Sequence, residues 1–387
     1  MVIDLTEWLN LAIRWLHVTA GIAWIGSSFY FVWLDNHLKK PGMGDASGEL
    51  WSVHGGGFYH NQKYQVAPAT MPDELHWFKW EAYFTWISGF SLLVLVYYVG
   101  AESFLLDPDK ADLGAGWGIA IGLGALGLGW LIYDGLCRSP VGRSNLALGV
   151  FWFGLLVYAA MLLDSLLSAR AAYMHIGAII GTAMVANVFV IIIPNQRKVV
   201  KDLVAGRTPD PALGAAAKQR SLHNNYMTLP VLFIMISPHY PMTYGAERPW
   251  LVLAMLGLTG VAVRHVFNLR GRGKNWGATA VLAIALAFAT VTYVTLEKGG
   301  SAPRVSGQAL TYADVQPILA THCASCHNLN PPPKGVALSS YEQVRAVSAQ
   351  IKAVSVDTQI MPLGNPTRMT PEERQRLGAW IAAGSPR

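Results

Sequence analysis

Cys323-Ala324-Ser325-Cys326-His327 is the stretch that decides the fold of the C-terminal part of this chain of 387 residues. Two thiols three positions apart, followed at once by a histidine, form a C-x-x-C-H site for covalent haem attachment. Each thiol can add to one haem vinyl group, and His327 can then bind the iron as an axial ligand. The sequence therefore predicts one haem c attached through Cys323 and Cys326.

A cysteine pair can also be a redox dithiol or half of a zinc site. The chain has one further cysteine, Cys137, so no second pair completes a zinc cage. No strand–helix–strand pattern surrounds the motif, as a thioredoxin-like dithiol would require. Cys137 ends an apolar segment and is expected to be a small buried side chain. These observations favour haem over both alternatives.

A haem of this class needs a second axial ligand, commonly a methionine thioether, which raises the reduction potential. Met361 lies downstream in Gln359-Ile360-Met361-Pro362-Leu363-Gly364, a Pro/Gly-rich loop that can approach the iron. Met369 is the rival. The sequence favours Met361 as the distal ligand.

The haem motif belongs to a small domain of its own. After Glu297 the apolar composition stops, and Lys298-Gly299-Gly300-Ser301-Ala302-Pro303 predicts a linker. We expect an integral membrane catalytic domain over 1–297, a linker over 298–308 and a class I cytochrome c domain over 309–387. Helices are predicted over 315–322 and 338–353, and a third begins at Thr370-Pro371-Glu372-Glu373, where threonine can cap the helix.

Composition identifies the larger part as a membrane protein. Only 13% of the residues are charged and 52% are hydrophobic, whereas about a quarter of an ordinary soluble chain is charged. Fourteen tryptophans and fifteen tyrosines fit aromatic belts at a lipid bilayer. The formal net charge of +6 is explained by the loops between spans, so no nucleic acid partner is expected.

Hydropathy predicts an all-α fold, a polytopic membrane helical bundle of about eight spans. The sixth is short and interrupted by Pro230, Pro238 and Pro241. The first begins beside Asp4 and Glu7 rather than basic residues, so it is expected to be a retained span and not a signal peptide. The expected spans are 8–33, 82–100, 114–136, 145–164, 172–194, 226–240, 249–268 and 276–296.

The loop charges predict the orientation. Lysine and arginine are concentrated in alternate loops, at 39, 40, 63, 79, 138, 143, 197–220 and 270–274, whereas the other loops hold only Lys110, Arg170 and Arg248. By the positive-inside rule the first set is cytoplasmic. Both termini and the cytochrome domain are then outside, where haem c is attached in bacteria.

Ionisable side chains at membrane depth are costly and tend to face the bundle interior. For any one histidine, a hydrogen bond to a neighbouring helix is as plausible as iron ligation. As a group these residues indicate a site that ligates a b haem, holds a polar substrate or relays protons. They are Arg14, His17, His175, Asn187, His223, Asn224, Asn225, Arg264, His265 and Asn268.

Two further segments carry a resemblance to a known family. They are His17-Val18-Thr19-Ala20-Gly21-Ile22-Ala23-Trp24-Ile25-Gly26 and His223-Asn224-Asn225-Tyr226-Met227-Thr228-Leu229-Pro230. Together with the C-terminal Cys-Ala-Ser-Cys-His site they resemble the bacterial membrane-bound urate oxidases of the PuuD type, also called urate hydroxylases. The first span is also similar to that of the HemJ-type protoporphyrinogen oxidases, which are membrane haem proteins.

The resemblance implies that urate is oxidised to 5-hydroxyisourate with water as the hydroxyl source. Electrons then pass to the fused haem c and on to the respiratory chain, through a soluble cytochrome c or a terminal oxidase. It also implies a multi-pass location in the bacterial inner membrane with the cytochrome domain periplasmic.

Urate is a planar anion rich in acceptors, so its site should offer arginine with amide or hydroxyl groups. On this resemblance, Arg14 and Arg264 are the catalytic arginines and His223 is the general base. Asn224, Asn225 and Thr228 are the substrate-binding candidates. His17, His175 and His265 are candidate ligands of a haem b iron.

Two other functions fit the same residues. An electron-transfer membrane cytochrome would pass electrons from b haem or quinone to haem c without urate chemistry. A transporter or anchor could carry a tethered cytochrome, although the intramembrane arginines and histidines argue against a passive anchor. The oligomeric state does not follow from the sequence.

Overall fold

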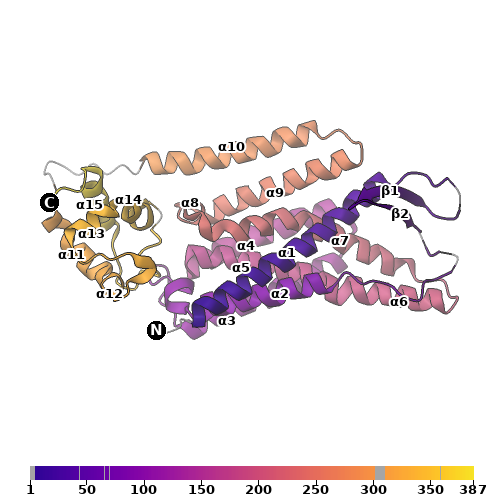
Figure 1. The fold of residues 1–387 in the computed structure, drawn as a ribbon, viewed down its shortest axis with the longest axis horizontal. Coiled ribbons are helices and arrows are strands. Elements are labelled where there is room, and N and C mark those ends of the chain that lie inside the picture. Colours follow the sequence, from indigo (N-terminus) through magenta and orange to yellow (C-terminus); the bar gives the residue numbers. More distant parts are fainter. Residues whose placement is uncertain (1–4, 43, 65, 69, 301–309, 358) are drawn as a thin grey trace.

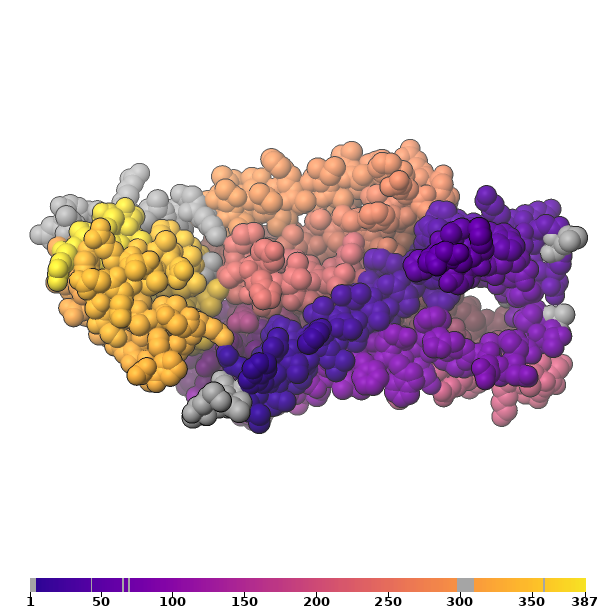
Figure 2. Space-filling model, viewed as in Figure 1, coloured from indigo at the N-terminus to yellow at the C-terminus, as the bar shows by residue number. Residues whose placement is uncertain are grey.

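The computed structural model describes residues 5–300 and 310–387, apart from positions 43, 65, 69 and 358. It contains a long helical bundle, residues 5–300, and a smaller helical C-terminal unit, residues 310–387, which abuts one end of the bundle (Figures 1 and 2). Most of the predicted linker, positions 301–308, lies outside the described residues.

The bundle is built mainly from long helices that run along its length (Figure 1). Two of them continue through π-helical segments: α2 passes into η1, and α5 passes through η4 into α6. The elements are α1 (Leu5–His37), α2 (Trp80–Leu93), η1 (Val94–Tyr98), η2 (Ala101–Leu105), α3 (Ala115–Arg138), η3 (Pro140–Arg143), α4 (Asn145–Leu166), α5 (Ala169–Ala186), η4 (Asn187–Ile192), α6 (Ile193–Val204), α7 (Pro211–Ile236), η5 (Ser237–His239), α8 (Pro241–Tyr244), α9 (Pro249–Gly271) and α10 (Gly277–Gly300).

Five helical stretches among the described residues are long and apolar enough to cross a membrane. They are Ala115–Arg138, Asn145–Leu166, Ala169–Val204, Pro249–Gly271 and Gly277–Glu297. They match five of the predicted spans and are compatible with a multi-pass membrane protein. The other three predicted spans fall on α1, on α2 with η1, and on the second half of α7. The total of eight stays a prediction.

Helix α7 begins well before the predicted start of the sixth span at 226. Asp210 caps it by accepting the backbone N–H of Ala212 at 2.9 Å, and Pro211 occupies the first turn, where no N–H is needed. Pro230 lies inside the helix without ending it. Hydropathy missed the first half because it is polar, and that half carries the side chains considered below.

The structure adds one feature that the all-α prediction did not include. Strands β1 (Gly48–His54) and β2 (Gly57–Lys63) pair antiparallel in the loop between α1 and α2. The connecting Gly55 and Gly56 have φ of 58° and 80°, which suits a two-residue hairpin turn. The hairpin lies at the end of the bundle opposite the C-terminal unit (Figure 1).

Helices α3 and α5 pack closely because α3 presents glycine to its neighbours. A side chain at Gly118 would collide with Leu106, and one at Gly122 would collide with the His175 ring and approach the Tyr98 hydroxyl to 2.8 Å. Small residues at this spacing let helix backbones approach in a membrane. Gly118 and Gly122 therefore serve close packing of α3 against its neighbours.

Gly122→Ala is therefore expected to destabilise the bundle. The added methyl group must displace His175 or separate α3 from α5, and overpacking of this kind costs about 1–3 kcal/mol. The measurement is the thermal unfolding midpoint of the detergent-solubilised protein. Gly124→Ala is the matched control, since nothing lies within 4 Å of its added carbon. Equal midpoints for the two variants would contradict the packing.

The C-terminal unit has its own apolar core, which contains the fully buried side chains Val315, Val344, Leu377 and Trp380. The predicted helix from Thr370 is confirmed as α15, with a reciprocal capping box between Thr370 and Glu373. The predicted helix over 338–353 is instead broken into short pieces. The elements are α11 (Tyr312–His322), α12 (Ala324–His327), η6 (Pro333–Gly335), α13 (Tyr341–Ala346), α14 (Ser348–Ile351), η7 (Lys352–Asp357) and α15 (Pro371–Ala382).

Candidate functional site

The cysteine motif lies where α11 ends and α12 begins. Cys323 is half-buried, whereas Cys326 is exposed. His327 Nδ1 lies 2.8 Å from the Val336 carbonyl oxygen, so this nitrogen carries the hydrogen and donates it. Fixing one ring nitrogen in this way leaves Nε2 as the basic nitrogen that an iron would need. The donor set fits a covalently attached haem.

The third cysteine lies elsewhere. Cys137 is half-buried near the end of α3, with its sulfur 4.0 Å from Nδ1 of His223. Burial raises the pKa of the Cys323 thiol to about 11, so this side chain is a neutral thiol near pH 7. Cys323 and Cys326 lie in one motif, whereas Cys137 lies on α3 of the bundle, so only the first two are placed to hold one haem.

Both candidate distal methionines lie in the segment between η7 and α15. Met361 is half-buried, and its carbonyl oxygen accepts a hydrogen bond from Arg374 at 2.6 Å. Met369 is buried in the core of the unit, and Asn365 Oδ1 accepts its backbone N–H at 2.8 Å. The side chains of Arg374 and Asn365 thus hold the backbone at Met361 and Met369, respectively.

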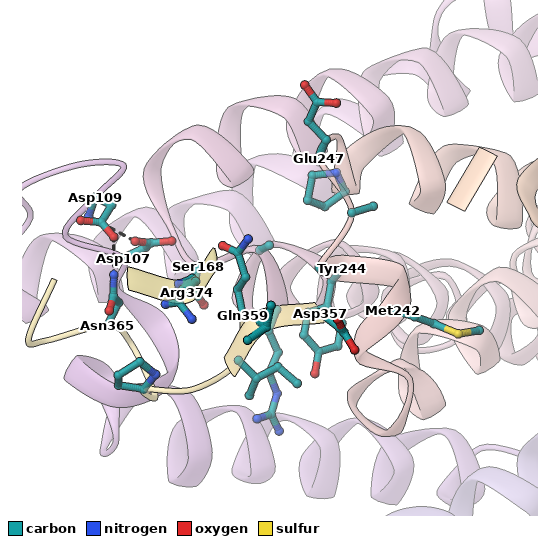
Figure 3. Close-up of a pocket in the computed structure, with 18 of the residues that line it drawn as sticks. Asp107, Asp109, Ser168, Met242, Tyr244, Glu247, Asp357, Gln359, Asn365 and Arg374 are labelled. Carbon is teal, nitrogen blue, oxygen red and sulfur yellow. Dashed lines mark hydrogen bonds between the residues drawn. The ribbon is translucent and has the colours of Figure 1, made fainter. Parts of the chain in front are cut away.

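A cavity of about 1080 Å³ separates this segment from the end of the bundle (Figure 3). Charged groups line it from both sides, and two of its ion pairs are Lys110–Asp164 and Lys352–Asp357, each at 2.6 Å. The two bodies also contact directly, because Asn365 donates a hydrogen bond to Asp109. The C-terminal unit is therefore docked on the bundle.

Within the bundle, α7 directs polar side chains to two sides. On one side Arg220, only 4% exposed, forms an ion pair with Asp134 at 2.6 Å and donates to Asn187 Oδ1 at 3.1 Å. Asn187 Nδ2 donates to the Tyr133 hydroxyl at 3.0 Å and to Asn224 at 2.8 Å. Tyr133 lies 2.8 Å from His223 Nδ1.

The direction of this network follows from its fixed donors and acceptors. Arg220 can only donate, so Asn187 presents Oδ1 to it and Nδ2 to Tyr133. On the far side, Asn145 Oδ1 accepts from Gln219 at 3.2 Å and lies 3.2 Å from His223 Nε2. His223 Nε2 therefore carries a hydrogen, and Nδ1 accepts one from Tyr133. The network holds His223 neutral.

On the other side of α7, Asn225 meets α9. Its Oδ1 accepts from Arg264 Nε at 3.0 Å and from Asn268 Nδ2 at 2.9 Å. The Arg264 guanidinium lies 3.8 Å above the Phe29 ring, a cation–π contact. Because Arg264 can only donate, the Asn225 carboxamide is fixed with its NH₂ group pointing away from the arginine.

A second cavity, of about 1520 Å³, reaches these residues from the end of the bundle that carries α6. Asn225, Asn268, Asn145 and Gln219 are among the side chains that line it. Asn225 is 2% exposed, and its Nδ2 has no hydrogen-bond partner among the described residues. A buried donor without a partner is costly, so a ligand acceptor would stabilise this site.

The structure brings together only some of the predicted site residues. Arg264 donates to Asn225, which lines the cavity, and Asn224 and His223 belong to the network on the other side of α7. Thr228 donates to the Asn224 carbonyl of its own helix at 2.8 Å. Arg14, the other candidate arginine, donates to Asn10 on α1 at 3.1 and 3.2 Å.

The three histidines expected to bind a haem b iron differ in whether a ring nitrogen is left to bind the iron. His175 is fully buried, donates from Nδ1 to the Ala171 carbonyl and accepts at Nε2 from Tyr98 at 3.2 Å. His17 is bonded through Nδ1 to the Thr85 carbonyl at 2.9 Å, and His265 through Nδ1 to Tyr226 at 2.6 Å. An iron fits His17 and His265 better than His175, whose ring nitrogens are both in use.

Sequence reasoning missed Tyr133, Asp134, Asn145 and Arg220. Arg220 was counted as a loop charge, although its side chain is buried. The available signal was Asp134, an acidic residue inside a predicted span, which required a cationic partner at that depth. Tyr133 and Asn145 carry no sequence signal of their own.

The comparison with protein families gives one match. A family model described as urate oxidase N-terminal matches residues 3–295, which span the bundle and both sides of the α7 network. No curated protein and no solved structure matches the chain.

Proposed function

Because this chain belongs to the urate oxidase N-terminal family, we propose that its bundle oxidises urate and passes the electrons to a haem c on the C-terminal unit. The family match over the bundle is the observation that supports urate as the substrate. The fit of Cys323, Cys326 and His327 to a covalent haem supports haem c as the electron acceptor. A haem bound there supplies a one-electron acceptor.

The proposed reaction balances with water as the oxygen source. Urate monoanion and water give 5-hydroxyisourate, one proton and two electrons. The C–O bond forms at the ring carbon that gains the hydroxyl, and the O–H bond of the attacking water breaks. The site must therefore bind an anion, admit water and accept one proton.

Arg264 and Asn225 are the proposed anion-binding pair. Arg264 supplies the positive charge, while its bond to Asn225 Oδ1 orients the unpaired amide donor of Asn225. Donors held in place before the ligand arrives recognise carbonyl oxygens without reorganisation. The cavity that Asn225 and Asn268 line provides the access route for urate and water. Arg14, Asn224 and Thr228 are proposed to support the site indirectly, since their side-chain bonds lie within the protein.

His223 is the proposed proton acceptor. In the network described, its basic Nδ1 faces Tyr133 and its Nε2–H faces Asn145, which lines the cavity. To take a proton from the cavity side, the ring must hold its hydrogen on Nδ1 instead. Rotation of the Asn145 carboxamide and of the Tyr133 hydroxyl permits that tautomer, so the base acts through these two neighbours.

Residues of α6 line the cavity that Asn225 reaches, and the cysteine motif lies at α12. Helices α6 and α12 lie toward opposite ends of the molecule (Figure 1). From Asn225 to Ile236 alone, the rise along α7 is about 17 Å at about 1.5 Å per residue. Electron tunnelling weakens exponentially with distance, so we propose a b haem between the two sites. His17 is its proposed ligand, because it lies on α1 about 18 Å nearer the C-terminal unit than Phe29, which packs against Arg264.

The proposed location is the bacterial inner membrane, with both termini and the haem c side periplasmic. The loop charges support this orientation by the positive-inside rule. The electrons would leave through a soluble cytochrome c or a terminal oxidase on that side.

The test is anaerobic mixing of purified, fully haem-loaded protein with urate while the haem absorbance is followed. We expect urate to reduce the haem and 5-hydroxyisourate to appear in proportion. Protein mixed with buffer alone is the control. Haem that stays oxidised in the presence of urate would refute the catalytic proposal and favour a membrane cytochrome without urate chemistry.

A further inference from the structure

The loop over 359–365, which we term the docking loop, lies between the C-terminal unit and the bundle. Ile360 packs against the apolar core of the bundle rather than the core of its own unit. Gly364 has φ of +68°, and a side chain there would collide with the Glu102 carbonyl. The loop backbone therefore touches the bundle backbone at a position that only glycine fits.

Asn365 connects the two bodies through a single carboxamide. Its Nδ2 donates to the Asp109 carboxylate of the bundle, and its Oδ1 accepts the Met369 N–H at 2.8 Å. Because a carboxylate can only accept, the orientation of the amide is fixed. Asn365 thus links the Asp109 carboxylate to the backbone of Met369.

Arg374 holds the other methionine. This arginine, 5% exposed, donates to the Ser355 and Met361 carbonyls at 2.5 and 2.6 Å. It lies beside Asp107 and Asp109 in the cavity of about 1080 Å³ between the two bodies (Figure 3). Burial is the main cause that raises the pKa of Asp107, whereas Asp109 is exposed.

A second polar contact between the two bodies joins two long, exposed side chains. Lys334 and Glu7 form an ion pair at 2.6 Å, but their side chains are 81% and 65% exposed. Pairs of this kind contribute about 0–1 kcal/mol. The docking loop, which includes Asn365, therefore provides the contacts that fix how the two bodies meet.

We propose that the bundle positions the distal haem ligand by way of the docking loop, with Asn365 and Asp109 as positioning residues. The inference rests on the proposed haem c. It applies whichever methionine binds the iron, since Met361 lies in the loop and Met369 is held by Asn365. Docking then sets the axial ligation and the reduction potential of the electron acceptor.

Asn365→Asp is the variant that tests the junction with the least change of shape. It retains an oxygen acceptor for Met369 but places a second carboxylate against Asp109, which repels the loop from the bundle. We expect the haem to lose methionine ligation. Because methionine raises the potential, the midpoint potential should fall and the ferric methionine–iron absorption band should weaken.

Asp109→Asn combined with Asn365→Asp is the matched rescue. The swap restores one donor and one acceptor at the junction and the net charge of the wild-type chain. Full-length protein with equal covalent haem content is compared in each case, by redox titration and absorption spectroscopy. Potential and spectrum should return toward wild type in the double variant.

Two results would overturn the inference. Asn365→Asp protein with wild-type spectrum and potential would show that the junction does not position the ligand. An altered single variant that the swap fails to restore would show that the effect comes from within the C-terminal unit. Neither measurement uses urate, so loss of urate oxidation or of haem attachment would be recognised separately as failure of the proposed function.

Discussion

Replacement of both Cys323 and Cys326 with serine is expected to abolish covalent haem attachment completely. Thioether bonds need sulfur, and a serine hydroxyl does not add to a haem vinyl group. His327 alone then holds haem only by coordination, which denaturation breaks. The measurement is haem-dependent peroxidase staining of the denatured chain together with its intact mass. Urate-dependent reduction of a bound c haem should disappear with it.

Cys137→Ser is the matched control for this loss. Cys137 lies in the bundle and does not contact the motif, so its replacement should leave the added mass of one haem unchanged. Haem bound covalently in the double serine variant, or lost from Cys137→Ser, would contradict the assignment of the motif.

Arg264→Ala is expected to lower kcat/KM for urate by about 30-fold or more. The change removes the buried positive charge and frees Asn225 from its fixed orientation. Loss of one partner of a buried, hydrogen-bonded charge pair costs about 2–5 kcal/mol, and about 1.4 kcal/mol corresponds to a factor of ten. Steady-state oxidation of urate by membranes with equal haem content is the measurement.

Arg270→Ala provides the comparison on the same helix. Arg270 is exposed near the end of α9, so its removal changes the net charge equally without touching the cavity. Near-wild-type kcat/KM in Arg264→Ala, or equal losses in the two variants, would rule out Arg264 as the anion-binding residue.

Local chemistry explains which parts of the structure the sequence could predict. The helix beginning at Thr370 follows from a cap and an adjacent proline, both readable within four residues. Five spans follow from uninterrupted apolar runs. In each case the information lies in neighbouring residues, so one sequence is enough.

The remaining features depend on partners far apart in the chain. Arg14 and Arg264 looked equivalent because both are ionisable and lie at membrane depth. Only the crossing of α7 and α9 separates them, by placing Asn225 against Arg264 while Arg14 bonds within α1. The junction between Asn365 and Asp109 was hidden for the same reason, since a polar loop residue carries no mark of its acceptor.

The hairpin β1–β2 was missed for a different reason. Its strands mix apolar residues with His54, His60 and Lys63, and no apolar face of period two is buried. Its turn depends on the positive φ angles of Gly55 and Gly56. Hydropathy therefore had nothing to detect.

The separation of the proposed urate cavity from the cysteine pair along the molecule has an energetic consequence. In the proposed orientation each electron moves from the cytoplasmic side toward the periplasm, while the proton is released near the cytoplasm. A bacterial membrane potential, negative inside, favours that outward movement of negative charge by about 2.3 kcal/mol per 100 mV for a full crossing. Urate oxidation would then be driven by the voltage of the cell and would in turn diminish it.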